Sequence, residues 1–371
     1  MVPTVPSLRI WPQVVMALLV APLNFAVWTL GDGRPALRPV FYLLCGVQLV
    51  LGVWGVVNGV KQAARKGSND TQKLSGIMGA LLGVMAAIGA PIGALLGFAA
   101  YNFTGGGGWG RPLRVRGRQL HPELKAGADW TEGERPSTRG LDEATCRALE
   151  GLWLHDAQKE HASVPAFSRI SWLLAAVGAP ASLLAWSHRA AMEEIEHAQK
   201  CFALAAGYGG RSFTVEPMAE LLLGGLNDVK DPLVTLAVES LKDGCLLEDF
   251  NADIAAKCAS VCEEPVTKKV LEQIAREERS HADFSWALIA WLLETHGQRV
   301  GPALDRALDA LHTVARPTTA NAEKQKLVEL ADQLALRRHG RITDAEWQAC
   351  WDARVRSTRA RASGTRVRPA A

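Results

Sequence analysis

The sequence predicts an all-α protein, a four-helix bundle with one long crossover that is preceded by three transmembrane helices. Three observations predict this fold class. The N-terminal third holds long stretches without a charged side chain, the middle of the chain has helical periodicity punctuated by glycine and proline, and one connection in that middle part is much longer than the others. A chain of 371 residues has room for both parts.

Three uncharged stretches in the first part are long enough to cross a bilayer. They run over residues 10–31, 39–60 and 74–103, and about 20 apolar residues in a helix span a hydrocarbon core of ~30 Å. We therefore expect a membrane region at residues 1–104 with three transmembrane helices. The alternative is a cleavable signal peptide at residues 1–30 followed by buried soluble helices, but no small-residue cleavage pattern follows the first stretch.

Charges and cysteines bear on the side of the membrane where the bundle lies. Lysine and arginine residues flank both ends of the uncharged stretches, so the charge rule is nearly balanced. The seven cysteines are odd in number and lie within helical patterns, which argues against a disulfide framework. Because reduced thiols favour the cytosol, we expect a multi-pass membrane protein whose helical bundle is cytoplasmic.

The rest of the chain divides at glycine and proline residues. Residues 105–140 are basic, begin with a run of glycines and contain prolines, which predicts a flexible linker. The bundle follows at residues 141–298, and residues 208–230 form its crossover. Residues 299–371 form a helical extension and an arginine-rich tail, which we expect to be solvated and partly disordered. The four bundle helices are expected at about 142–177, 180–207, 232–262 and 265–298.

Charged side chains occupy inward stripes of these helices, where apolar side chains are expected. The first and third helices each place one glutamate on the stripe, and the second and fourth each place a Glu-x-x-His motif on it. In each antiparallel helix pair the acidic groups meet at about the same height. In chain order these residues are Glu160, Glu194, His197, Glu248, Glu278 and His281.

This combination of residues predicts a site for two metal ions. Burying four carboxylates without cations would cost many kcal/mol, because each ion loses its hydration and repels its neighbours. Four glutamates and two imidazoles suit two iron ions, with manganese as the alternative, better than four-coordinate zinc. A single Glu-x-x-His also occurs as a surface ion pair or around a core histidine. Of the nine histidines, however, only His197 and His281 follow a glutamate by three residues.

Four short motifs surround these residues: EHASV at 160–164, EIEH at 194–197, GCLLE at 244–248 and ERSH at 278–281. They resemble the ferritin-like di-iron carboxylate superfamily, and in particular bacterial ferritin-like domain proteins of unassigned function. The resemblance covers about residues 142–298. It implies that the six residues are metal ligands, with Glu194 and Glu278 as the bridges, an arrangement found in bundles of this class.

The resemblance also implies an oxidoreductase that reacts with dioxygen or peroxide at a carboxylate-bridged di-iron centre. None of the three tyrosines lies on a ligand stripe near the centre, which argues against a stable tyrosyl radical. The chain has no paired CxxC motifs of a rubredoxin domain, so an oxygenase would need a separate electron donor. The alternatives are a ferroxidase or other iron-handling protein, and a structural bundle that its metals staple together without turnover.

Residues around the expected ligands complete the prediction. Asp156 lies one turn before Glu160 and is a candidate for orienting a ligand imidazole. Glu196, beside His197, is expected to face water. The expected partners are membrane lipids and the separate electron donor, and the sequence also allows a homodimer, whereas nucleic acid is not expected.

Overall fold

The chain is described by a computed structural model. It describes residues 110–115, 118–223, 229–317 and 322–366, together with single positions between residues 47 and 84. The chain divides into two compact units, Met1–Thr104 and Gly105–Ala371. Nearly all described positions of the first unit are helical.

The membrane prediction is wrong for the part of the chain that the structure describes. None of the helices formed by the described residues combines the length and the apolar composition that crossing a bilayer requires. This finding contradicts the predicted multi-pass membrane location. The first predicted span, residues 10–31, lies outside the described residues, and only single positions of the spans at 39–60 and 74–103 are described.

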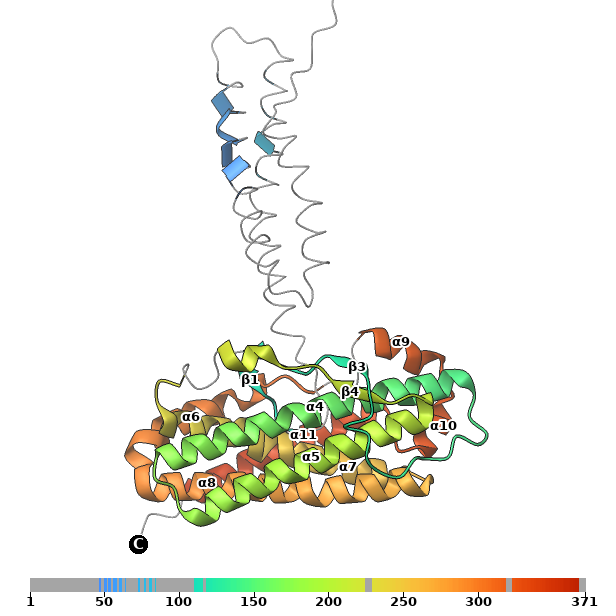
Figure 1. Ribbon diagram of the computed structural model, residues 1–371. Coiled ribbons are helices and arrows are strands. Elements are labelled where there is room, and N and C mark those ends of the chain that lie inside the picture. Colours follow the sequence, from blue (N-terminus) through green and yellow to red (C-terminus); the bar gives the residue numbers. More distant parts are fainter. Residues whose placement is uncertain are drawn as a thin grey trace, which may run out of the picture. The chain divides into compact units, whose positions relative to one another are not determined.

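The second unit is mainly helical, which confirms the all-α prediction at this level (Figure 1). Its long helices correspond to the four predicted ones, with the third divided into α6, a π-helix and α7. The helices are α4 (Glu143–Ala176), α5 (Ala181–Gly209), α6 (Pro232–Glu239), the π-helix η3 (Ser240–Glu248), α7 (Asp249–Val261), α8 (Pro265–Asp309), α9 (Ala322–Leu330), α10 (Gln333–Arg338) and α11 (Asp344–Arg366). Short 3₁₀ turns are η2 (Ala219–Leu223) and η4 (Ala310–Thr313), and the strands are β1 (Arg114–Val115), β2 (Arg118–Gln119), β3 (Leu124–Ala126) and β4 (Phe213–Val215).

Polar caps and glycine explain where the long helices begin and end. The Asp142 side chain accepts a hydrogen bond from the Thr145 amide at 2.7 Å and so caps the start of α4. Gly178 has a φ of +68°, a conformation that suits glycine just after a helix end. The fourth helix runs further than predicted, to Asp309, but its backbone leaves the helical region at His296, close to the predicted end.

Contacts between the long helices show that neighbours are antiparallel. Between α4 and α5, the hydroxyls of Ser171 and Ser187 are 2.8 Å apart, while Glu160 Oε2 lies 3.8 Å from His197 Nδ1. The residue further along α4 thus contacts the residue nearer the start of α5, so the two helices run in opposite directions. The same reversal relates η3 and α7 to α8. The helices meet along the predicted inward stripes, whose residues are buried almost without exception.

The segment before α4, predicted as a flexible linker, packs against the helices instead. Leu113 and Val115 are buried, and β3 pairs with β4 of the crossover in an antiparallel register. The apolar residues between the arginines of this segment provide a face that can be buried, a feature that its average composition hides. Arg111, two residues before Leu113, is also buried and is considered further below.

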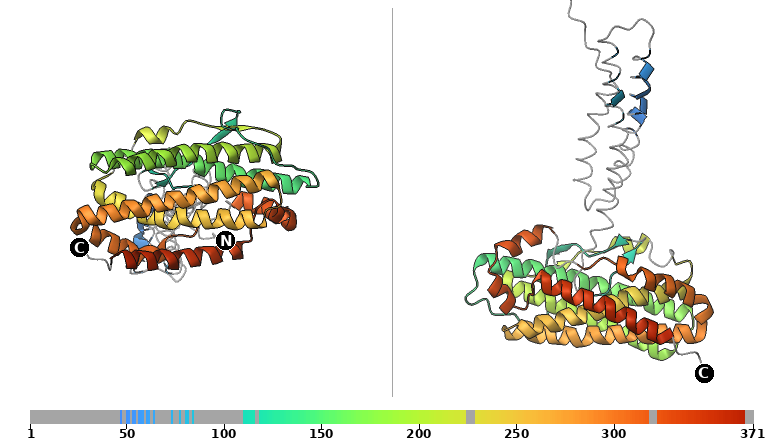
Figure 2. Two further views of the ribbon diagram at one scale, coloured as in Figure 1. Left: turned by 90° about the horizontal axis from the view of Figure 1, so that it is seen from below. Right: turned by 180° about the vertical axis from the view of Figure 1, so that it is seen from behind.

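Helix α11 stands where a partly disordered tail was predicted. It lies along α7 and α8 (Figure 2). The ring of Trp351 packs edge-on against Phe250, with centroids 5.1 Å apart, and Arg354 pairs with Asp253 at 2.6 Å. Apolar rings and partly buried ion pairs therefore anchor a helix whose arginine content alone indicates a solvated tail.

Candidate metal centre

The six residues predicted as ligands converge in the middle of the long helices. Each side chain is 0% exposed. Glu160 comes from α4, Glu194 and His197 from α5, Glu278 and His281 from α8, and Glu248 from the last position of η3. A π-helix winds more residues into a turn than an α-helix, so it changes the direction in which the residues at its end point.

Ligand atoms of these residues form two overlapping groups, within each of which all atoms lie within 4.8 Å of one another. Both groups contain Glu194 and Glu278, the two residues predicted as bridges. The first group adds Glu160 and His197, and the second adds Glu248 and His281. The buried glutamate and histidine cluster could therefore hold a metal ion, and its two halves share two carboxylates.

Both imidazoles turn Nδ1 toward the carboxylates. His281 Nδ1 lies 3.3 Å from Glu194 Oε1 and 3.9 Å from Glu278 Oε2. His197 Nδ1 lies 3.6 Å from Glu194 Oε2 and 3.8 Å from Glu160 Oε2. Ligands of one ion, each at a bond length of ~2 Å, lie ~3–4 Å apart, so these separations fit donors around a cation.

The opposite nitrogen of each imidazole contacts a glutamate from the facing helix. His197 Nε2 on α5 lies 2.6 Å from Glu277 Oε2 on α8, and His281 Nε2 on α8 lies 2.9 Å from Glu193 Oε2 on α5. A carboxylate in this position accepts a hydrogen bond from Nε2–H and so leaves Nδ1 free to bind a metal. The rings are thus oriented reciprocally across the contact between α5 and α8.

Sequence reasoning missed Glu193 and Glu277, although a signal for them exists. Each stands directly before an inward glutamate, so that both motifs read Glu-Glu-x-x-His. The predicted orienting residue, Asp156, does not contact either imidazole within the described structure. It is buried and pairs with Arg341 at 2.8 Å. Glu196 is exposed and pairs with Lys200, as predicted for a residue facing water.

Electrostatics within the cluster indicate a shortage of positive charge. Burial raises the pKa of the Glu160 and Glu278 carboxyls well above the usual range, and neighbouring carboxylates raise it further. Burial alone would lower the pKa of His281, but its hydrogen bond with Glu193 and the close carboxylates of Glu194 and Glu248 raise it to about 9. In the absence of a metal ion, protons must supply the missing charge.

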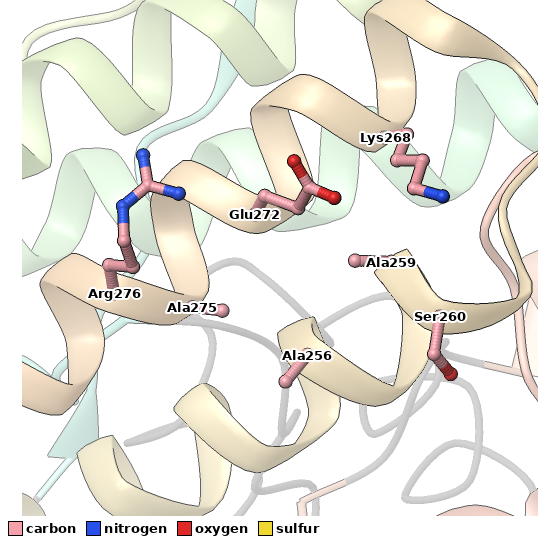
Figure 3. Close-up of a pocket in the computed structure, with 7 residues that line it drawn as sticks. All are labelled: Ala256, Ala259, Ser260, Lys268, Glu272, Ala275 and Arg276. Atoms are coloured by element: carbon pink, nitrogen blue, oxygen red, sulfur yellow. The ribbon is translucent and has the colours of Figure 1, made fainter.

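A hollow of about 400 Å³ lies elsewhere, lined by residues of both α7 and α8 (Figure 3). Its lining consists of Ala256, Ala259, Ser260, Lys268, Glu272, Ala275 and Arg276. None of the six clustered residues takes part in this lining, so the hollow does not belong to the candidate metal centre.

Comparison with known proteins does not identify the chain. No family model, no curated protein and no solved structure matches it. The resemblance to ferritin-like proteins therefore stays a prediction based on the motifs.

Proposed function

We propose that this protein is a ferritin-like di-iron protein that acts as an oxidoreductase on dioxygen or peroxide. The proposal assigns Glu160, Glu194, His197, Glu248, Glu278 and His281 as the ligands of two iron ions, with Glu194 and Glu278 shared between them. The repeated order of a single glutamate helix followed by a Glu-x-x-His helix supports the family assignment.

One observation carries the proposal. All eight carboxylate oxygens of the four clustered glutamates, and Nδ1 of both imidazoles, are buried without a hydrogen-bond partner. Buried polar atoms without partners are rare, because each loses its hydration without compensation. A cation compensates carboxylate oxygens and a deprotonated ring nitrogen at once. Two divalent ions would also balance the charge of four carboxylates.

The donor set supports the choice of metal. Four carboxylates and two imidazoles give mainly oxygen ligands with some nitrogen, and no thiolate belongs to either group. Such a set favours iron or manganese over zinc, whose protein sites are four-coordinate and rich in sulfur or nitrogen. We propose iron, with manganese as the alternative.

An iron pair supplies the electron transfer that the reduction of dioxygen or peroxide requires. The protein residues have other tasks. Glu193 and Glu277 orient the two imidazoles, and the apolar residues around the cluster exclude bulk water. A separate donor would deliver electrons, because the described cysteines, which are all free, form no cluster with metal-ligand spacing among the described residues.

Metal analysis of the full chain tests the proposal. After anaerobic loading with Fe(II) and removal of excess metal, we expect two iron ions per chain. The substitutions His197→Ala and His281→Ala should each reduce the iron content toward one ion per chain. His188→Ala is the matched control, because His188 lies on α5 but is exposed. Failure of the wild-type chain to bind iron or manganese would refute the proposal.

Addition of oxygen then separates the types of activity. An oxidoreductase should oxidise the bound pair and take up no further iron. A ferroxidase would continue to take up and oxidise iron beyond two ions per chain. A structural metal site would bind the ions, melt at a lower temperature after chelation and show no reaction with oxygen.

A further inference from the structure

Arg111 is an unusual residue beside the candidate metal centre. It is 3% exposed and is the one arginine in the buried class among the described residues. Its guanidinium donates to Ser285 Oγ at 3.3 Å and to the Glu239 main-chain oxygen at 3.4 Å. It also lies over the ring of Phe167, 5.3 Å from the ring centroid. No carboxylate of a described residue lies within 4.0 Å of it.

Other arginines of this region have acidic partners. Arg114, three residues further along the same segment, pairs with Asp243. Arg169 pairs with Glu239. A buried guanidinium normally has such a partner, because the loss of hydration is otherwise uncompensated. The two long hydrogen bonds of Arg111 to neutral oxygens leave most of its donor capacity for a ligand.

Several contacts connect Arg111 to the ligands of the metal centre. Ser285, which accepts its hydrogen bond, itself donates to the His281 main-chain oxygen at 3.1 Å. The ring of Phe167, over which Arg111 lies, also contacts His281, with its centroid 5.1 Å from that of the imidazole. Gly110 lies so close to Glu160 that a Cβ atom added to it would be 2.8 Å from Glu160 Oε2.

The segment that carries Arg111 closes this side of the cluster without being part of a helix. Ser163 on α4 donates to the Arg111 main-chain oxygen at 3.1 Å, and Asn251 on α7 donates to the Gly110 oxygen at 3.4 Å. These hydrogen bonds, together with those of the guanidinium, hold residues 110–111 between the helices.

We propose that Arg111 binds the carboxylate group of an organic substrate beside the metal pair, an inference that rests on the proposed di-iron site. Two divalent ions would neutralise the four clustered carboxylates, and Glu193 and Glu277 face the imidazoles, so in a loaded centre none of these six carboxylates is left to pair with Arg111. A carboxylate supplies one negative charge and two oxygens in the geometry that a guanidinium recognises. Ser163 and Ser285 provide hydroxyl groups next to the same place.

The test uses the full chain loaded with Co(II), whose visible absorption reports changes around the metal. Titration with acetate at constant ionic strength should shift the bands of the wild-type protein to saturation, whereas acetamide, the neutral analogue, should not. Arg111→Gln should keep the same metal content but bind acetate about 10- to 100-fold more weakly. Arg111→Lys, which retains the charge but not the forked donor geometry, should show a smaller loss.

Arg114→Gln is the matched control, since it removes a positive charge from the same segment and should leave acetate affinity unchanged. Equal acetate affinities of the wild type and Arg111→Gln, or equal responses of the wild type to acetate and acetamide, would overturn the proposal. The wild-type comparison and Arg111→Lys decide the matter if Arg111→Gln does not fold. A chain that binds no metal would refute the proposed function, whereas a loaded chain that does not distinguish acetate would refute this inference alone.

Discussion

Replacement of Glu277 by alanine should weaken the binding of one metal ion and leave the other largely in place. The Glu277 carboxylate lies 2.6 Å from His197 Nε2 and holds this ring with Nδ1 toward the cluster. A hydrogen bond to a charged group contributes about 1.5–3 kcal/mol, which corresponds to an affinity change of about 10- to 100-fold. Because the Glu277 side chain is 25% exposed, solvent screens it, and we expect a loss of about tenfold.

Competition with a chromophoric chelator under anaerobic conditions measures this loss. In this titration the chelator should remove two ions from the wild-type chain. In the variant, one ion should be removed at a lower chelator concentration than in the wild type, and the other at nearly the same concentration. Glu277→Gln should lie between the two, because its amide oxygen keeps an acceptor but not the charge. Glu196→Gln is the control, since Glu196 stands next to His197 in the chain but is exposed and pairs with Lys200.

Wild-type affinity of Glu277→Ala for both ions would refute the orienting role. Loss of both ions, together with a lower melting temperature of the metal-free variant, would assign Glu277 a role in holding α5 and α8 together instead. The equivalent substitution at Glu193 should weaken the other ion, because Glu193 contacts His281 at 2.9 Å.

Three further predictions concern stability and pH. Gly244→Ala places a Cβ atom 1.9 Å from Ser285 Oγ and should lower the free energy of unfolding in urea by about 1–3 kcal/mol, whereas Gly301→Ala, in open space on α8, should raise it by about 0.5–1 kcal/mol. Arg354→Ala removes an ion partner from two aspartates of α7 and should cost about 1–3 kcal/mol in the same assay. Metal affinity should rise with pH up to about 9, because the pKa of His281 is raised to about 9 and a metal ion must displace the proton of this imidazole. A weakly buffered assay with a pH-indicator dye should therefore detect proton release on metal binding. The absence of proton release would contradict this prediction.

The helical part of the fold and the six clustered residues could be predicted because their signals are local and periodic. Each of the four predicted bundle helices carries a charged residue at a position of its apolar stripe. A charged residue that is buried there needs a compensating charge, which a cation can supply. Glu160 and Glu248 were found in this way, although no histidine motif surrounds them. The π-helix before Glu248 was not foreseen, since no residue pattern distinguishes it from the α-helix on either side.

The missed features depend on contacts between distant parts of the chain. Arg111 and Ser285 are 174 residues apart, so local composition indicates only a basic linker. The arginines of α11 likewise suggest a solvated tail, because the aspartates that pair with Arg354 are about 100 residues away. Glu277 lies outside the inward stripe of its helix, where the sequence predicts a solvent-exposed side chain. Its contact with His197 depends on how α5 packs against α8, which the local sequence does not indicate.

The reciprocal contacts between α5 and α8 make the two halves of the cluster depend on each other. Successive helical residues point in directions about 100° apart, so in each glutamate pair one carboxylate turns into the cluster while its neighbour turns toward the facing helix. Glu193 and Glu194 do this on α5, and Glu277 does the same beside the inward glutamate of α8. The helix that supplies a glutamate common to both groups thus also orients the imidazole of the other half. Any displacement of α5 along α8 would misplace both imidazoles at once, which restricts the pair to one register.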